Sequence, residues 1–133
     1  MPIKKNSGRQ GVIVASLFIG FADPSPYGTA QNAIDLPGNA VVVGGDVTVI
    51  TPWNSTTTAT LQLGDAAVPA RYTSAPVDLK TAGRTALTLT GYKHSVAESL
   101  KALLAQTGAA ATAGTARVTL QYFVEGRAAF SQG

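Results

Sequence analysis

Residues 40–72, AVVVGGDVTVITPWNSTTTATLQLGDAAVPARY, contain the pattern that decides the fold class. Polar and apolar residues alternate over 46–50 and again over 58–63, which is typical of strands that are buried on one face. Pro52 cannot donate a hydrogen bond to a neighbouring strand, so the first run should end before it. We therefore predict two strands joined as a wide hairpin, with Trp53 where the first strand becomes loop.

Residues 11–22, GVIVASLFIGFA, form the first apolar run of the chain. The run follows a basic start, as in a signal peptide, but Asp23 and Pro24 come directly after it and no convincing cleavage site is present. It is rich in β-branched residues and Phe, and Gly20 interrupts it. These features favour a strand, and the lack of alternation predicts burial on both faces.

Further strands are expected on both sides of the central stretch. Residues 117–125, RVTLQYFVE, have the strongest strand pattern, and residues 31–36 and 85–90 have shorter ones. Gly44 and Gly45 stand inside a strand pattern, where a glycine pair is typical of a bulge or of a corner between sheets.

Residues 95–108 carry conflicting signals. Ser95 and Glu98 match a capping box, and the leucines that follow are spaced as on one face of a helix. Read as a strand, the segment would place Glu98 on the inward face together with Leu100 and Leu104. The residues alone leave helix and strand open.

The pattern as a whole predicts an all-β protein. About seven or eight short strands are separated by loops rich in Gly, Pro and Asn, with no internal repeat and no dividing linker in 133 residues. We expect a single-domain β-sandwich over residues 11–125, of the jelly-roll type, between a flexible polar arm (1–10) and a C-terminal tail (126–133).

The composition favours a scaffold that packs against other proteins. Charged residues are 13% of the chain, about half the usual share, while 45% are hydrophobic. The net charge of +3 arises in the arm, where Lys4, Lys5 and Arg9 lie, and the remaining chain balances seven basic against seven acidic residues. The body therefore shows no basic face for nucleic acid. We expect neither a nucleic-acid partner nor a membrane partner.

Candidates for catalysis are scarce. Cysteine is absent, which excludes disulfides and thiolate chemistry. The single histidine, His94, falls in an expected loop and is interpreted as a surface residue. The carboxylates are scattered singly, and no nucleophile, phosphate-loop or calcium-loop motif occurs. We predict no catalytic, metal-binding or cofactor-binding residues, so the protein is not expected to be an enzyme.

A family resemblance rests on several segments that follow one another in a fixed order. They are QNAIDLP (31–37), AVVVGG (40–45), the VTV run with the Trp53–Asn54 turn, ATLQLGD (59–65), PARY (69–72), VDLKTAG (77–83) and VTLQYFVEGR (118–127). Over about residues 15–130 the chain resembles small tailed-bacteriophage virion proteins that decorate or cement the capsid. One departure is VPARY at 68–72, where an acidic D-P-D-R-Y-like segment is expected.

The resemblance implies a structural role. Such a protein, made in the host cytoplasm, would bind the outer surface of the virion capsid and stabilise neighbouring capsomers. Its partners would be the major capsid protein and further copies of itself, as a dimer or trimer. The resemblance also implies an extended segment at 95–105. Because the acidic residues expected at 68–72 are missing, the resemblance implies a role in this segment only for Arg71 and Tyr72, which would structure the loop. Trp53 is a further candidate loop-structuring residue.

The terminal arms are the candidate contact segments, because they are polar and lack a core pattern. Their anchors for the capsid or a sister subunit would be Lys4, Lys5, Arg9, Arg127 and Phe130. The alternative function is a phage-borne or secreted carbohydrate-binding β-sandwich, which would need several exposed aromatic side chains.

Overall fold

The computed structural model describes residues 11–24 and 26–126, which form nine strands. The predicted sandwich domain is thus described almost entirely, whereas the predicted arm (1–10) and nearly all of the tail lie outside the described residues. The strands are β1 (Ile13–Gly20), β2 (Gln31–Leu36), β3 (Ala40–Thr51), β4 (Thr58–Gly64), β5 (Val77–Asp78), β6 (Gly83–Ala86), β7 (Lys93–His94), β8 (Glu98–Thr107) and β9 (Thr115–Val124).

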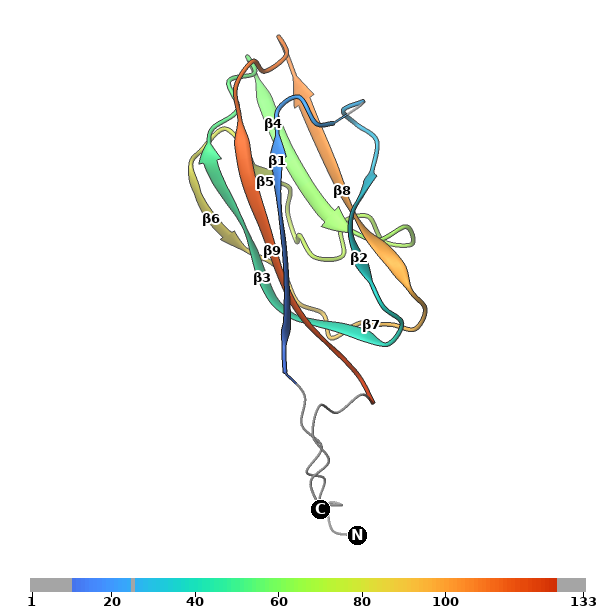
Figure 1. The fold of residues 1–133 in the computed structure, drawn as a ribbon. Coiled ribbons are helices and arrows are strands. Elements are labelled where there is room, and N and C mark those ends of the chain that lie inside the picture. The colour runs from blue at the N-terminus through green and yellow to red at the C-terminus, as the bar shows by residue number, and fades with distance from the viewer. Residues whose placement is uncertain (1–10, 25, 127–133) are drawn as a thin grey trace.

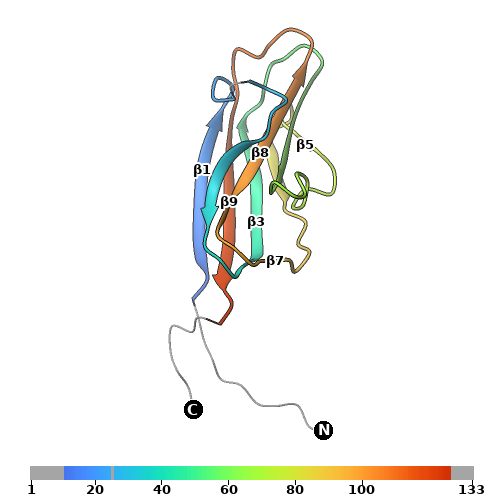
Figure 2. The ribbon, with the colours of Figure 1, turned by 90° about the vertical axis from the view of Figure 1, so that its right-hand side faces the viewer.

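Two antiparallel sheets lie face to face (Figures 1 and 2). One has the order β1-β9-β3-β6, with β7 beside the start of β3, and the other has the order β2-β8-β4-β5. All connections pass from one sheet to the other except those between β4 and β5 and between β6 and β7. Without the short β7, this is the eight-stranded jelly roll that was predicted.

The predicted hairpin between β3 and β4 is wrong. Both runs are strands, but β3 pairs with β9, β6 and β7, whereas β4 pairs with β8 and β5 in the opposite sheet. The connection crosses the end of the sandwich, and its Trp53 is buried there, with its amide donating to the carbonyl oxygen of Leu79 at 2.8 Å. A two-residue turn would keep such strands adjacent, but this longer loop with a buried indole joins the two layers.

The glycine pair produces the predicted bulge. The register between β3 and β9 shifts between Val42 and Gly44, so that one extra residue stands on β3. Gly45 has φ +145°, and a Cβ there would meet the carbonyl oxygen of Thr119. The backbone conformation and the close approach of β9 both require glycine at this position.

The core lies between the sheets and follows the period-two pattern of the strands. Val47 and Val49 of β3, Leu61 and Leu63 of β4, and the alternate residues of β8 and β9 point inward and are buried. Each buried Val or Leu stabilises the fold by about 1.5–3 kcal/mol relative to an exposed one.

The prediction that β1 is buried on both faces is wrong. β1 pairs with β9 along one side only and forms an edge of its sheet. Ile19 is buried and Leu17 is half-buried, whereas Val14 and Phe18 on the other face are exposed by 58% and 60%. The sequence lacks alternation because the outward face of this strand is apolar too.

Two other segments differ in structure or in length from what their local sequence patterns predict. Residues 98–107 form β8, held between β2 and β4, so strand pairing overrides the helical signals and the family-based expectation of an extended segment is confirmed. The strand expected at 85–90 is β6, which begins earlier, at Gly83, and ends at Ala86 because Thr88 leaves the sheet to donate its amide to Tyr72.

Candidate functional site

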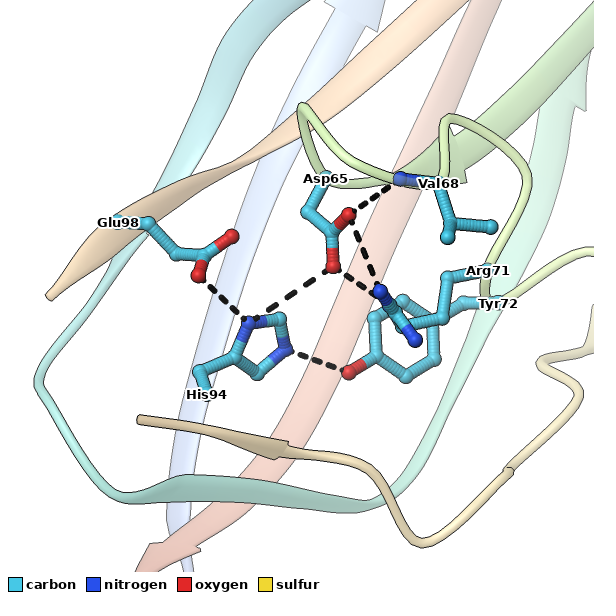
Figure 3. Close-up of polar contacts among 6 residues, drawn as sticks. All are labelled: Asp65, Val68, Arg71, Tyr72, His94 and Glu98. Carbon is cyan, nitrogen blue, oxygen red and sulfur yellow. Dashed lines mark hydrogen bonds and ion pairs between the residues drawn. The ribbon is translucent and has the colours of Figure 1, made fainter. Parts of the chain in front are cut away.

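A buried polar cluster fills one end of the sandwich. It consists of Asp65 and the loop after β4, His94 of β7 and Glu98 at the start of β8 (Figure 3). Segments distant in the sequence meet here, because β7 pairs with the start of β3 and Glu98 lies opposite Leu36 at the end of β2.

Asp65 organises the loop that follows β4. Its Oδ1 accepts a hydrogen bond from the amide of Val68 at 2.7 Å, and its own amide donates to the carbonyl oxygen of Val68 at 3.0 Å. Aspartate side chains commonly stabilise turns by accepting hydrogen bonds from backbone amides that lie close in the sequence. The carboxylate is 1% exposed, so its charge must be compensated within the protein.

Arg71 supplies that compensation. Its Nε lies 2.5 Å from Oδ2 of Asp65, and one terminal nitrogen lies 3.4 Å from Oδ1. The guanidinium also stacks on Tyr92, with Cζ 3.5 Å from the ring centroid. The arginine is thus fixed by both an ion pair and a cation–π contact.

His94 and Tyr72 form the deepest pair of the cluster. The Tyr72 hydroxyl lies 2.7 Å from His94 Nε2, and the two residues are exposed by only 1% and 0%. His94 Nδ1 faces Glu98 Oε2 at 3.4 Å and Asp65 Oδ2 at 3.9 Å, without hydrogen-bond geometry to either. The ring nitrogens of His94 thus face different partners, with Nε2 toward the Tyr72 hydroxyl and Nδ1 toward the two carboxylates.

The interpretation of His94 as a surface residue is therefore wrong. His94 is buried because β7 carries it beneath the loop of Asp65, and two carboxylates converge on its ring. One signal was present: a strand at 98–107 places Glu98 on the inward face, where it needs a partner. No local motif could identify that partner, because the members of the cluster are separated in sequence.

The cluster has the composition of a cation site but is already neutralised in part. Asp65, His94 and Glu98 offer ligand atoms within 4.8 Å of one another. Both oxygens of Asp65 accept hydrogen bonds from Arg71, so a metal ion would compete with the guanidinium for the same atoms. The arrangement is better suited to joining the loop, β7 and β8 than to binding a substrate or a metal.

The ionisation of the cluster follows from its burial and its pairs. Burial alone would raise the pKa of Asp65, but the hydrogen bonds from Arg71 and from the amide of Val68 lower it below 3.8. The Arg71 pKa is raised, chiefly by the hydrogen bond to Asp65. Burial raises the pKa of Tyr72 to about 12.

The raised pKa of Tyr72 predicts an alkaline loss of stability. The stability that it contributes is fully present below the unfolded-state pKa of about 10 and is lost as the pH rises through about 12. Tyr72→Phe removes the titrating group, so the free energy of unfolding should fall less steeply over this range than in the wild type. Urea titrations at a series of alkaline pH values measure both slopes, and equal slopes would contradict the assignment.

Of the predicted loop-structuring residues, Arg71 and Tyr72 meet in the cluster and Trp53 lies elsewhere. The indole of Trp53 is 2% exposed, and its Nε1 donates to the Tyr27 hydroxyl at 3.1 Å. The single tryptophan is therefore not available as a stacking surface for a sugar. The predicted contact residues Lys4, Lys5, Arg9, Arg127 and Phe130 lie outside the described residues.

The described part of the chain has no helix that is long and apolar enough to cross a membrane. Its first and last segments lie at the same end of the sandwich, since Ile13 near the start of β1 lies opposite Tyr122 near the end of β9 (Figure 1). The buried cluster is near this end, because Ala40 of β3 lies opposite both His94 and Val124.

Three solved structures share this fold. A chain of the cyanophage Pam1 capsid asymmetric unit matches with a TM-score of 0.68 and 24% identity over 93% of this chain and 92% of that one. A chain of the acid-stable capsid of Helicobacter pylori bacteriophage KHP30 matches at 0.67 and 15%, over 92% and 94%. A chain of the Ralstonia phage GP4 capsid matches at 0.65 and 20%, over 96% and 92%. No protein-family model and no curated protein matches the sequence. At these identities the likeness establishes a shared fold.

Proposed function

We propose that this protein is a structural component of a phage virion that binds the outside of the capsid and cements neighbouring capsomers. The observation that carries the proposal is the match of more than nine-tenths of the chain to chains of three phage capsids. Each match covers more than nine-tenths of both chains, so the likeness extends over the whole fold and is not limited to a few strands.

The structure is suited to such a role because its two sheets enclose a single buried core, and because β1 starts and β9 finishes at the same end of the sandwich. A cement protein needs a rigid body and contact segments rather than turnover, and the buried cluster fastens the loops near the end at which β1 starts and β9 finishes. Both terminal arms would then reach the same surface, with Lys4, Lys5, Arg9, Arg127 and Phe130 as their anchors. An assembly that contacts several capsomers gains affinity, because later contacts become intramolecular.

The proposal is tested by co-sedimentation of the protein with capsid shells of the phage that encodes it, after the shells have been stripped of accessory proteins. We expect saturable binding in a fixed ratio to the capsid protein, and shells that resist heat better when the protein is bound. A protein that stays in the supernatant at every concentration would contradict the proposal.

Two deletion variants test the role of the arms. Removing residues 1–10 or residues 127–133 should weaken shell binding by about tenfold or more, the loss expected when one of several linked contacts is removed. The melting temperature should stay near that of the full chain, because the core lies within the described residues. Undiminished binding after both deletions would exclude the arms as anchors.

A further inference from the structure

The free edge of β1 differs from the other three edges of the sandwich. β5 has two residues and follows Pro76, β6 has four and includes Arg84, and β2 contains Asp35 and a register irregularity. Short strands, charges, prolines and bulges are the usual devices that prevent edge pairing. β1 has eight residues without charge or proline, and its register with β9 is unbroken.

The backbone of β1 offers hydrogen-bonding groups along this edge. The amide of Phe21 donates to Gly114 on the β9 side at 3.1 Å, whereas the amide of Gly20 turns away and donates to Oδ2 of Asp23 at 2.6 Å. Successive amides of a strand point to opposite sides. The amide and carbonyl groups of Val14, Ser16 and Phe18 therefore point away from β9, and within the described residues no strand pairs with them.

We propose that β1 pairs antiparallel with β1 of a second copy, about a two-fold axis at Ser16. In this register the outward amide and carbonyl groups of Val14, Ser16 and Phe18 pair only with those of the same three residues in the second copy, which no other register achieves. The amide of Gly20 stays bonded to Asp23. It places Ser16 opposite Ser16, and Val14 opposite Phe18 of the partner subunit on the outer face. Pairing by this geometry forms a closed, isologous dimer with one continuous sheet.

The side chains are complementary to themselves in this register. On the inner face Ala15 would lie opposite Leu17 of the partner subunit, and Ile13 opposite Ile19 of the partner subunit. No charge is brought opposite a like charge, and apolar cross-strand pairs stabilise an antiparallel ladder. Val14 and Phe18, exposed by 58% and 60%, would be covered in part.

A cavity of about 230 Å³ opens beside the same edge. It lies between the sheets, and Leu17, Ile19 and Leu104 are among its lining residues. Because Ile13 of the partner subunit would lie opposite Ile19, its side chain would stand at the mouth of this cavity. The second copy therefore satisfies the backbone of β1 and adds apolar contact on both faces.

Single cysteines test the register, since the natural chain has none. Directly opposed, hydrogen-bonded residues have Cα atoms about 5.5 Å apart, which is within the range of a disulfide. Ser16→Cys should therefore form a disulfide-linked dimer under mild oxidation. Val14→Cys and Phe18→Cys should each form little disulfide-linked dimer on their own. An equal mixture of the two variants should cross-link, because position 14 lies opposite position 18 in this register. Thr85→Cys on the exposed edge strand β6 is the control and should stay monomeric on a non-reducing gel.

The oligomeric state of the full chain supplies the second test. Sedimentation equilibrium should show a dimer, and Ser16→Pro should raise the dissociation constant roughly 10- to 100-fold by removing the two hydrogen bonds at the axis. The missing amide faces away from β9, so the fold should persist. Phe18→Lys should also weaken the dimer, whereas Thr85→Lys should not. A monomeric wild type, or Ser16→Cys that cross-links no faster than Thr85→Cys, would overturn the inference. The test uses isolated protein, so its result is independent of capsid binding.

Discussion

Replacing Asp65 with alanine is expected to lower the free energy of unfolding by about 3–5 kcal/mol, the range found when one partner of a buried ion pair is removed. The change would leave Arg71 without its counter-ion in a site where its side chain is only 13% exposed. It would also leave the amide of Val68 without its acceptor, so the loop after β4 would lose one of the two hydrogen bonds between residues 65 and 68. Chemical denaturation of both proteins at neutral pH measures the difference.

Glu125→Gln is the matched control for Asp65→Ala. Glu125 and Lys93 also form an ion pair, at 3.4 Å, but their side chains are exposed by 57% and 43%. Exposed pairs contribute about 0–1 kcal/mol, because water and salt screen them. If Asp65→Ala lowers the free energy of unfolding by no more than Glu125→Gln does, the cluster does not stabilise this end of the sandwich.

The same residue determines part of the acid response. Because the folded-state pKa of Asp65 is lowered, the stability that it contributes is present above the unfolded-state pKa of about 4 and is lost as the pH falls below it. Asp65→Asn, which keeps the size of the side chain, should therefore reduce the loss of stability on acidification.

Gly114→Ala should destabilise the fold by about 3 kcal/mol or more, through overpacking and backbone strain together. A Cβ at this position would lie 2.5 Å from Cδ2 of Trp53 and 2.8 Å from its Cε3, and the backbone has φ +155°. The indole cannot move away easily, because it is buried and its Nε1 is bonded to Tyr27. The melting temperature and the urea midpoint should both fall.

Gly83→Ala separates the two causes. Gly83 has a similar φ of +139°, but a Cβ there would have no atom within 4 Å. In this variant only the backbone conformation is unfavourable, so its free energy of unfolding should fall by about 1–2 kcal/mol. If Gly114→Ala and Gly83→Ala lose the same amount, contact with Trp53 does not constrain position 114.

Local patterns predict most strands of this protein but not their partners. Alternation identifies β3, β4 and β9, and the glycine pair identifies the bulge, because these features depend on residues close together in the chain. The predicted hairpin failed because two strands that follow one another can pair or can lie in opposite sheets, and the loop of Trp53 permits both. Residues 98–107 show the converse case, where pairing on both sides outweighs a helical pattern.

The buried cluster could not be predicted from the sequence for a related physical reason. His94 has neighbours in sequence that are typical of a surface loop, and only the pairing of β7 with β3 places it between Tyr72, Asp65 and Glu98. Similarly, an apolar run such as β1 does not reveal whether a strand is covered on both sides or stands at an edge. That distinction depends on the topology of the whole sheet.

Cryo-electron microscopy of purified virions tests the proposed capsid role in its native setting. We expect density for this jelly roll on the outer surface of the shell, in contact with more than one capsomer and present at every equivalent position. Virions whose shell lacks this density, and from which the protein is absent by mass spectrometry, would contradict the role.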